Sequence, residues 1–193
     1  MKISLYTLNV NGFSPEITAL TFPYFERYAA KIGAEFVQST TREFPDWPVV
    51  YEKLQIHRLM WERDDDWAIF FDADALVHPD LPDLTTCLPP DTVAHNGSDF
   101  ASIRWRYDDY FRRDGRNIGS CTWCVACPRW CRDLWRPLDD LTLNEAEARI
   151  FPTMKELATT KTRASLIDDY TLSRNIARFG LKYVSLMDRL KAI

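Results

Sequence analysis

The fold is decided by the stretch Trp67-Ala68-Ile69-Phe70-Phe71-Asp72-Ala73-Asp74-Ala75-Leu76-Val77. Its first five residues form an apolar run bounded by polar side chains, which is typical of a β-strand buried on both faces. Two carboxylates follow, and holding both ionised is costly unless a positive group lies close. Mg²⁺ and Mn²⁺ take one or two carboxylates together with substrate phosphates. Asp72 and Asp74 are therefore candidate metal ligands at a diphosphate site.

Strands and helices alternate before this stretch. The predicted elements are a strand over Lys2–Leu8, a helix between Ser14 and Ile32, a strand over Ala34–Thr40 and a helix over Pro48–Arg63. Pro23 predicts a break that leaves Tyr24–Ile32 as the stronger helix. The alternation predicts a mostly parallel, doubly wound sheet, and such sheets bind ligands beyond the carboxyl ends of their strands.

The second half of the chain is predicted from its turn and capping residues. We expect a loop over Pro79–Pro90, a strand over Ser120–Ala126, a helix opened by Pro128, a helix from the Thr142-Leu143-Asn144-Glu145 capping box toward Leu157, a helix over Asp168–Phe179 and a strand over Leu181–Leu186. No repeat or long linker divides the chain. We therefore expect residues 1–193 to form one compact α/β domain.

Composition excludes several classes of protein. The 193 residues are 46% apolar and 13% aromatic, which excludes a disordered chain, collagen and a coiled coil. The net charge of −4 argues against a general nucleic-acid binder. The apolar runs are too short to cross a bilayer, and the N-terminus lacks the regions of a signal peptide. We expect a cytoplasmic protein.

Four segments carry a resemblance to a known family. Tyr51–Met60 and Asp66–Val77 together resemble nucleotide-sugar-dependent glycosyltransferases of the GT-A fold, in which a lysine-bearing helix precedes a strand that ends in Asp-x-Asp. Arg116–Ser120 is similar to the family's Asn-x-Gly segment, and Asp168–Gly180 resembles its late acidic motif. The resemblance covers nearly the whole chain. It implies one Rossmann-like GT-A domain with a mostly parallel central sheet flanked by helices, a nucleotide-binding half over 1–80 and an acceptor half over 81–193.

Carried over residue by residue, the resemblance implies a hexosyltransferase that uses Mn²⁺ or Mg²⁺ and a nucleotide-sugar, with a UDP-sugar expected first. Asp74 would hold the metal on the donor diphosphate, and Asp72 would do so directly or through ribose contacts. The other implied donor contacts are Thr7, Leu8 and Asn9 with the base, Lys53 with phosphate or ribose, and Asn117 and Gly119 with the sugar. Asp168 or Asp169 would contact sugar or acceptor and serve as catalytic base.

These assignments have structural alternatives. Lys53 fits a solvated helix lysine equally well, and Asp168 and Asp169 also suit the capping of a helix. Retaining relatives often carry a late metal-binding histidine, but no histidine follows His95 in this chain. The third ligand is then absent, water, or supplied elsewhere, with His78 as a possible substitute.

Two other patterns imitate functional motifs. Asp64-Asp65-Asp66 also satisfies Asp-x-Asp, and we interpret it as a solvated turn. Cys121-x-x-Cys124-x-x-Cys127-x-x-x-Cys131 has the spacing of an iron–sulfur run. Thr122, Trp123, Val125 and Ala126 between its first three cysteines belong to a predicted apolar strand. The alternation of a strand would send Cys121 and Cys127 to one face and Cys124 to the other. We therefore expect buried free thiols.

The sequence says less about the acceptor than about the donor site. Arg104–Arg116 interleaves arginines, aromatic side chains and aspartates, and it predicts an acceptor loop. A glycan, a small molecule or a modified nucleic-acid base would fit it. Two alternative functions remain open: a haloacid-dehalogenase-type phosphohydrolase with Asp72 as nucleophile, and a non-catalytic module that binds nucleotide-sugars or nucleic acid.

Overall fold

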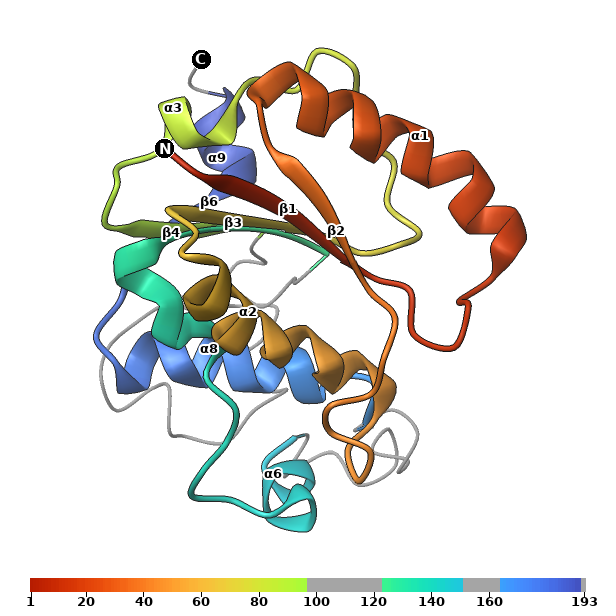
Figure 1. Cartoon of the computed structure of the whole chain (residues 1–193). Helices are drawn as coiled ribbons and strands as arrows, with labels where there is room; N and C mark the ends of the chain where they lie inside the picture. Colours follow the sequence, from red (N-terminus) through yellow and green to blue (C-terminus); the bar gives the residue numbers. More distant parts are fainter. Residues whose placement is uncertain (97–122, 151–163, 192–193) are drawn as a thin grey trace.

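A mixed β-sheet lies between two layers of helices in the computed structural model (Figure 1). The structure describes residues 1–96, 123–150 and 164–191, and within these ranges six strands pair in the order β2-β1-β3-β5-β4-β6. The strands are β1 Ile3–Leu8, β2 Glu35–Ser39, β3 Trp67–Phe71, β4 Thr92–His95, β5 Cys124–Pro128 and β6 Lys182–Ser185. β5 runs antiparallel to β3 and β4, and the other pairs are parallel. The predicted α/β domain with a mostly parallel sheet is confirmed.

Each face of the sheet has its own apolar core. One face is covered by α1 Pro15–Ile32, α3 Leu84–Cys87 and α9 Leu186–Lys191. The other is covered by the 3₁₀ helices η1 Val49–Gln55 and η2 Arg129–Trp135 and by α2 Ile56–Arg63 and α8 Ile167–Arg178. The short helix α6 Leu143–Ala148 lies beyond this layer, further from the sheet. Phe71 packs with Phe25 of α1, whereas Phe70 packs with Trp135 of η2. All of β3 is buried, as its apolar run predicts. None of the helices in the described ranges is long and apolar enough to cross a membrane.

Pro23 does not break the first helix, contrary to the sequence prediction. α1 runs without interruption from Pro15 to Ile32 and ends at Gly33, which adopts φ 67°. A proline inside a helix leaves the carbonyl four residues earlier without its partner. Pro23 and Ala19 are both exposed, so water can bind that carbonyl. On the buried face Phe25 packs against the sheet, and this contact holds the helix together.

The described part of the second half shows three elements that the sequence did not predict: α3, β4 and α9. β4 was missed because its four residues carry too little alternation, and the predicted loop over 79–90 contains the single turn α3. The capping box at Thr142 is confirmed: its side chain accepts from the N–H of Glu145, and the Glu145 side chain accepts from the N–H of Thr142. α8 and β6 occupy the predicted ranges within a residue or two.

β5 lies further along the chain than the predicted strand over 120–126. It places Cys124 in the core beneath α1 and Cys127 in the core beneath α8. The side chains of Cys124, Cys127 and Cys131 are all buried. Opposite faces of a strand cannot supply ligands to one cluster, so this geometry agrees with simple packing.

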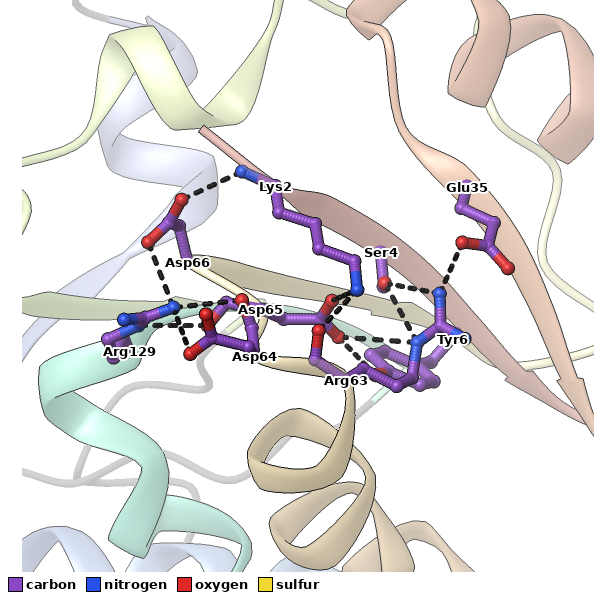
Figure 2. Close-up of polar contacts among 9 residues, drawn as sticks. All are labelled: Lys2, Ser4, Tyr6, Glu35, Arg63, Asp64, Asp65, Asp66 and Arg129. Carbon is purple, nitrogen blue, oxygen red and sulfur yellow. Dashed lines mark hydrogen bonds and ion pairs between the residues drawn. The ribbon is translucent and has the colours of Figure 1, made fainter.

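The turn between α2 and β3 is solvated only in part: Asp64 is exposed as interpreted from the sequence, but Asp65 is buried, which corrects that interpretation. Asp65 is only 1% exposed, and it accepts a hydrogen bond from the hydroxyl of Tyr6 (Figure 2). Arg63 lies 3.6 Å from Asp65 and 2.5 Å from Glu35. Arg129 pairs with the two flanking aspartates at 2.9 and 3.2 Å. This charged cluster lies at the amino end of β3 and joins β1, β2, α2 and η2.

Candidate functional site

A pocket of about 340 Å³ opens at the carboxyl ends of β1 and β3. It is lined by Leu8, Val10, Phe13, Val49, Val50, Lys53, Asp72, Ala73, Asp74, Trp123, Ser165, Asp168 and Asp169. The sequence places all four acidic residues and Lys53 among its candidates, and the structure brings them together here. Four carboxylates and one ammonium therefore face a common space.

The turn after β3 presents the two aspartates differently. Asp72 ends the strand, and its backbone N–H donates to Trp123 at 2.9 Å. The N–H of Ala75 then donates to the carbonyl of Asp72, which closes a tight turn. The hydroxyl of Thr21 in α1 donates to the carbonyl of Ala73 at 2.6 Å and fixes that turn against the helix. Asp74 consequently lies exposed at the pocket while Asp72 lies deeper.

Lys53 joins Asp72 to Asp168 inside the pocket wall. Its Nζ lies 2.8 Å from Oδ1 of Asp72 and 2.6 Å from Oδ2 of Asp168. The side chains of Lys53 and Asp168 are each 4% exposed, so this ion pair is removed from water, whereas Asp72 keeps 30% of its side chain exposed. Lys53 is thus neither a solvated lysine nor a freely moving one.

The charges of this group follow from burial and pairing. Burial alone lowers the pKa of Lys53, but the carboxylates of Asp168 and Asp72 outweigh it and hold that pKa well above its ordinary value. Burial raises the pKa of Asp72, and the Lys53 ammonium offsets only part of this effect. Because its pKa is raised, the Lys53 side chain carries its positive charge at neutral pH.

Lys53 lies in a 3₁₀ helix within the range predicted to be helical. η1 precedes α2 within the range predicted as one helix, and Tyr51 anchors it. The ring of Trp47 stacks on Tyr51 at 4.0 Å, and the Tyr51 hydroxyl accepts from the N–H of Leu138 at 2.7 Å. These contacts fix the direction in which Lys53 leaves the helix.

Glu52 secures the loop that enters η1. Its fully buried carboxylate accepts from Nε of Arg42 at 2.7 Å and from the backbone N–H groups of Glu43 and Phe44 at 2.8 and 3.0 Å. Sequence reasoning did not identify Tyr51 or Glu52 as positioning residues. Their partners are loop atoms that no periodicity reveals.

The carboxylates of Asp72 and Asp74 fit a divalent cation whose other ligands are water and substrate phosphate. Within the described residues, no side chain pairs with the carboxylate of Asp74, and Asp72 uses only Oδ1 on Lys53. No group of three His, Cys, Asp or Glu side chains in the same ranges could hold a metal. Two carboxylates suit Mg²⁺ or Mn²⁺, which complete their shells with waters and substrate phosphates.

The late acidic pair divides into two environments. Asp168 and Asp169 occupy the first turn of α8, where the N-cap Leu166 has no side-chain cap bond. Asp168 is buried against Lys53, but Asp169 is partly exposed and also lines the pocket. Of the two, only Asp169 is accessible to an acceptor hydroxyl. The catalytic assignment of either residue stays a prediction.

The end of β1 contributes one of its three candidate residues to the pocket wall. Leu8 lines the pocket. Thr7 is buried, and its hydroxyl donates to the carbonyl of Phe71 at 2.8 Å, so it joins β1 to β3. The Asn9 amide donates to the side chain of Gln38 at 3.1 Å and so joins β1 to β2.

Much of the pocket wall is apolar, and the sequence analysis missed this part. Val10, Phe13, Val49, Val50 and Trp123 line it. Phe13, Val49 and Trp123 are among the exposed large apolar side chains of the described chain. The exposed Phe13 follows Asn11 and Gly12, which both adopt positive φ, and this turn signal after the first strand could have identified it.

The candidate third metal ligand, His78, does not line this pocket. His78 lies in a different pocket, beside Tyr24 and Tyr28, and its ring accepts from the N–H of Asp80, so it is no substitute metal ligand here. Asn117, Gly119 and the acceptor loop over 104–116 lie outside the described residues.

Comparison with known proteins supports the fold. No protein-family model and no curated protein matches the sequence. Among solved structures, the chain is similar to the crystal structure of a glycosyltransferase involved in the glycosylation of the major capsid of PBCV-1. The TM-score is 0.53 at 12% identity, over 96% of this chain and 81% of that one. The chain therefore has the α/β fold found in that glycosyltransferase.

Proposed function

We propose that this protein transfers a sugar from a nucleoside-diphosphate sugar to a hydroxyl acceptor, with Mn²⁺ or Mg²⁺ as cofactor. The observation that carries the proposal is the convergence of Asp72, Asp74, Asp169 and Lys53 in one pocket at the carboxyl ends of β1 and β3. The fold shared with a glycosyltransferase adds support.

The charge of the pocket favours a metal-dependent donor. Four carboxylates against one ammonium would repel a diphosphate that entered alone. A divalent ion held by Asp74 and Asp72 would offset most of that negative charge, bind the diphosphate directly and stabilise the charge on the departing nucleotide. The apolar wall around Phe13 and Val49 would bury the flat base.

Asp169 is the proposed general base. It would accept the proton of the acceptor hydroxyl as that oxygen bonds to the anomeric carbon and the bond from this carbon to the diphosphate breaks. Asp168 would hold Lys53 and so position Asp72. UDP is the first nucleotide to test, and a glycan, a small molecule and a modified nucleic-acid base are the acceptor classes to test.

The test combines binding with turnover. Thermal unfolding is measured with UDP, GDP, CDP and ADP, each with and without Mn²⁺, and hydrolysis of the matching sugar nucleotides is then followed. A Mn²⁺-dependent rise in Tm with one nucleotide, together with Mn²⁺-dependent hydrolysis, would support the proposal. Binding without any turnover would favour a non-catalytic module.

One observation favours a second candidate, a phosphohydrolase with Asp72 as nucleophile. Lys53 lies 2.8 Å from that carboxylate, where it could also bind a phosphate substrate. Hydrolysis of p-nitrophenyl phosphate without any nucleotide-dependent rise in Tm would support this candidate against the glycosyltransferase.

A further inference from the structure

A second, smaller pocket lies between α1 and the segment that follows the turn at Asp74. Its volume is about 150 Å³, and it is lined by the segment 77–79 and by four residues that share one face of α1, namely Tyr24, Arg27, Tyr28 and Lys31. Among the described residues that line it, none is acidic, whereas four carboxylates line the pocket at Asp74. The loop after β3 therefore connects an acidic pocket to a basic one.

The guanidinium of Arg27 has no carboxylate partner in the described ranges. Most other arginine and lysine side chains there form ion pairs, as Arg42 does with Glu52. Arg27 instead donates from Nε to the carbonyl of Pro23 at 3.2 Å, and its guanidinium lies 4.3 Å from the centre of the Tyr24 ring. These contacts hold the side chain and leave its two terminal NH₂ groups for a ligand.

The backbone of the segment that closes the pocket holds two further donors. Nζ of Lys31 donates to the carbonyls of Pro79 at 3.1 Å and Leu81 at 2.9 Å, which leaves one of its three N–H groups. Nδ1 of His78 accepts from the N–H of Asp80 at 3.2 Å, so the ring can donate from Nε2. Asp80 lies 3.8 Å from that ring, but its carboxylate is 92% exposed and does not line the pocket.

The pocket is preformed, and its charges are uncompensated. Tyr28 is buried, and its hydroxyl donates to the carbonyl of Pro82 at 2.9 Å and accepts from the N–H of Leu84 at 3.3 Å, which fastens the segment to α1. Two like charges one turn apart destabilise a helix. Lys31 gains from its place in the last turn of α1, where a cation is favoured, but Arg27 lies a turn earlier. A bound anion would remove the repulsion between them.

We infer that this second pocket binds an oxyanion of the size of phosphate, either free phosphate or a phosphate monoester. Guanidinium and ammonium groups are the side-chain donors best suited to phosphate oxygens. Pockets that enclose a whole drug-sized ligand start at about 300 Å³, so a cavity half that size suits one ionised group. The site needs no metal, and the inference does not depend on the proposed function.

The first experiment uses the wild-type protein without Mn²⁺ or nucleotide. Thermal unfolding is measured in increasing inorganic phosphate, in glucose 6-phosphate, and in NaCl of equal ionic strength. We expect both phosphates to raise Tm above its value in NaCl, with the concentration dependence of a single site. A larger rise with glucose 6-phosphate would identify a phosphate monoester as the ligand, and an equal or smaller one would identify free phosphate. If neither compound raised Tm above its value in NaCl, the inference would be overturned.

The second experiment locates the site. The double variant Arg27→Met/Lys31→Met should bind phosphate about tenfold or more weakly, as judged from the dependence of Tm on phosphate concentration, because charge-assisted hydrogen bonds are lost. Arg189→Met/Lys191→Met is the matched control: it removes two cations from α9, where Arg189 likewise donates to a backbone carbonyl, that of Cys87. Equal affinities in the first variant and the wild type, or an equal loss in both variants, would overturn the inference. Both cations are exposed, so the variant should fold; if it does not, Arg27→Gln alone is measured.

Discussion

The ammonium of Lys53 lies 2.6 Å from the carboxylate of Asp168, a residue 115 positions further along the chain. The contact fastens η1 to α8, the two helices that flank the pocket on the same face of the sheet. Because both side chains are almost fully buried, this pair matters for stability as well as for the site.

Asp168→Ala should destabilise the fold strongly. The substitution removes a buried carboxylate that pairs with the buried Lys53 ammonium, and breaking such a pair costs about 3–5 kcal/mol. Urea denaturation would measure the loss as a lower midpoint with an unchanged slope. A loss below about 1 kcal/mol, the usual value of an exposed pair, would show that the pair is not held out of water.

Asp169→Asn should separate catalysis from stability and serves as the matched variant for Asp168. The carboxylate of Asp169 is partly exposed, whereas that of Asp168 is buried, so the free energy of unfolding should fall much less than in Asp168→Ala. Loss of a general base lowers turnover by roughly 10²–10⁴-fold. Single-turnover transfer with saturating donor is the measurement, and an unchanged rate would remove Asp169 from the mechanism.

Asp74→Asn should abolish the Mn²⁺-dependent rise in Tm caused by nucleotide. The carboxylate is exposed and pairs with no side chain in the described ranges, so the variant should unfold like the wild type without ligands. Asp80→Asn is the control, because that acid is 92% exposed on the same loop but lies outside the pocket. If both variants lost the Mn²⁺-dependent increase in Tm equally, the effect would come from the overall charge of the loop and not from a metal site at Asp74.

Phe13→Ala should weaken nucleotide binding without altering Tm. Its ring is 44% exposed at the pocket, and stacking of a base on an aromatic ring contributes about 1–3 kcal/mol, which corresponds to a fivefold or greater loss of affinity. Leu20→Ala removes an even more exposed apolar side chain of α1 that does not line the pocket. Isothermal titration of both variants with UDP and Mn²⁺ compares them, and equal affinities would exclude stacking on Phe13.

Stability should fall in acid because of His95. This histidine is buried at the end of β4, with its ring 4.4 Å from that of Tyr183, and burial lowers its pKa from 6.5 to about 3. The unfolded chain binds a proton there below pH 6.5 while the folded chain does not, so stability is lost as pH falls from about 6.5 toward 3. One such group changes the free energy of unfolding by about 1.4 kcal/mol per pH unit.

His95→Phe provides the comparison for this pH dependence. The variant keeps an aromatic ring beside Tyr183 but cannot bind the proton. Its free energy of unfolding should therefore fall less steeply with decreasing pH, by the contribution of about one proton. Urea midpoints measured between pH 4 and 7 test this difference. Parallel curves for the two proteins would show that His95 does not drive acid unfolding.

The fold and half of the site could be predicted from local patterns. The apolar run from Trp67 to Phe71 predicts a central strand, and the position of Asp72 and Asp74 directly after it places them at the ligand-binding edge. The failures have physical causes. Pro23 does not break α1 because it lies on the exposed side of that helix. Asp65 is buried because the hydroxyl of Tyr6, a residue distant in the sequence, donates a hydrogen bond to it.

The rest of the site depends on contacts between distant residues. Nothing in the spacing of Lys53 and Asp168 indicates that they meet, and either residue alone resembles a solvated charge. Phe13 and Trp123 join the wall from two separate loops, so only the folded chain brings them together. Sequence patterns identify the residues that end strands, but not the partners that burial assigns to them.

The charged cluster around Asp65 has a consequence for the pocket. The cluster (Figure 2) joins the chain at the amino end of β3, whereas the pocket with Asp74 and Asp169 opens at the carboxyl end of that strand. Substitutions of Asp74 or Asp169 therefore leave this cluster untouched. The pocket can change its exposed carboxylates without loosening the contacts that hold the strands together at their other ends.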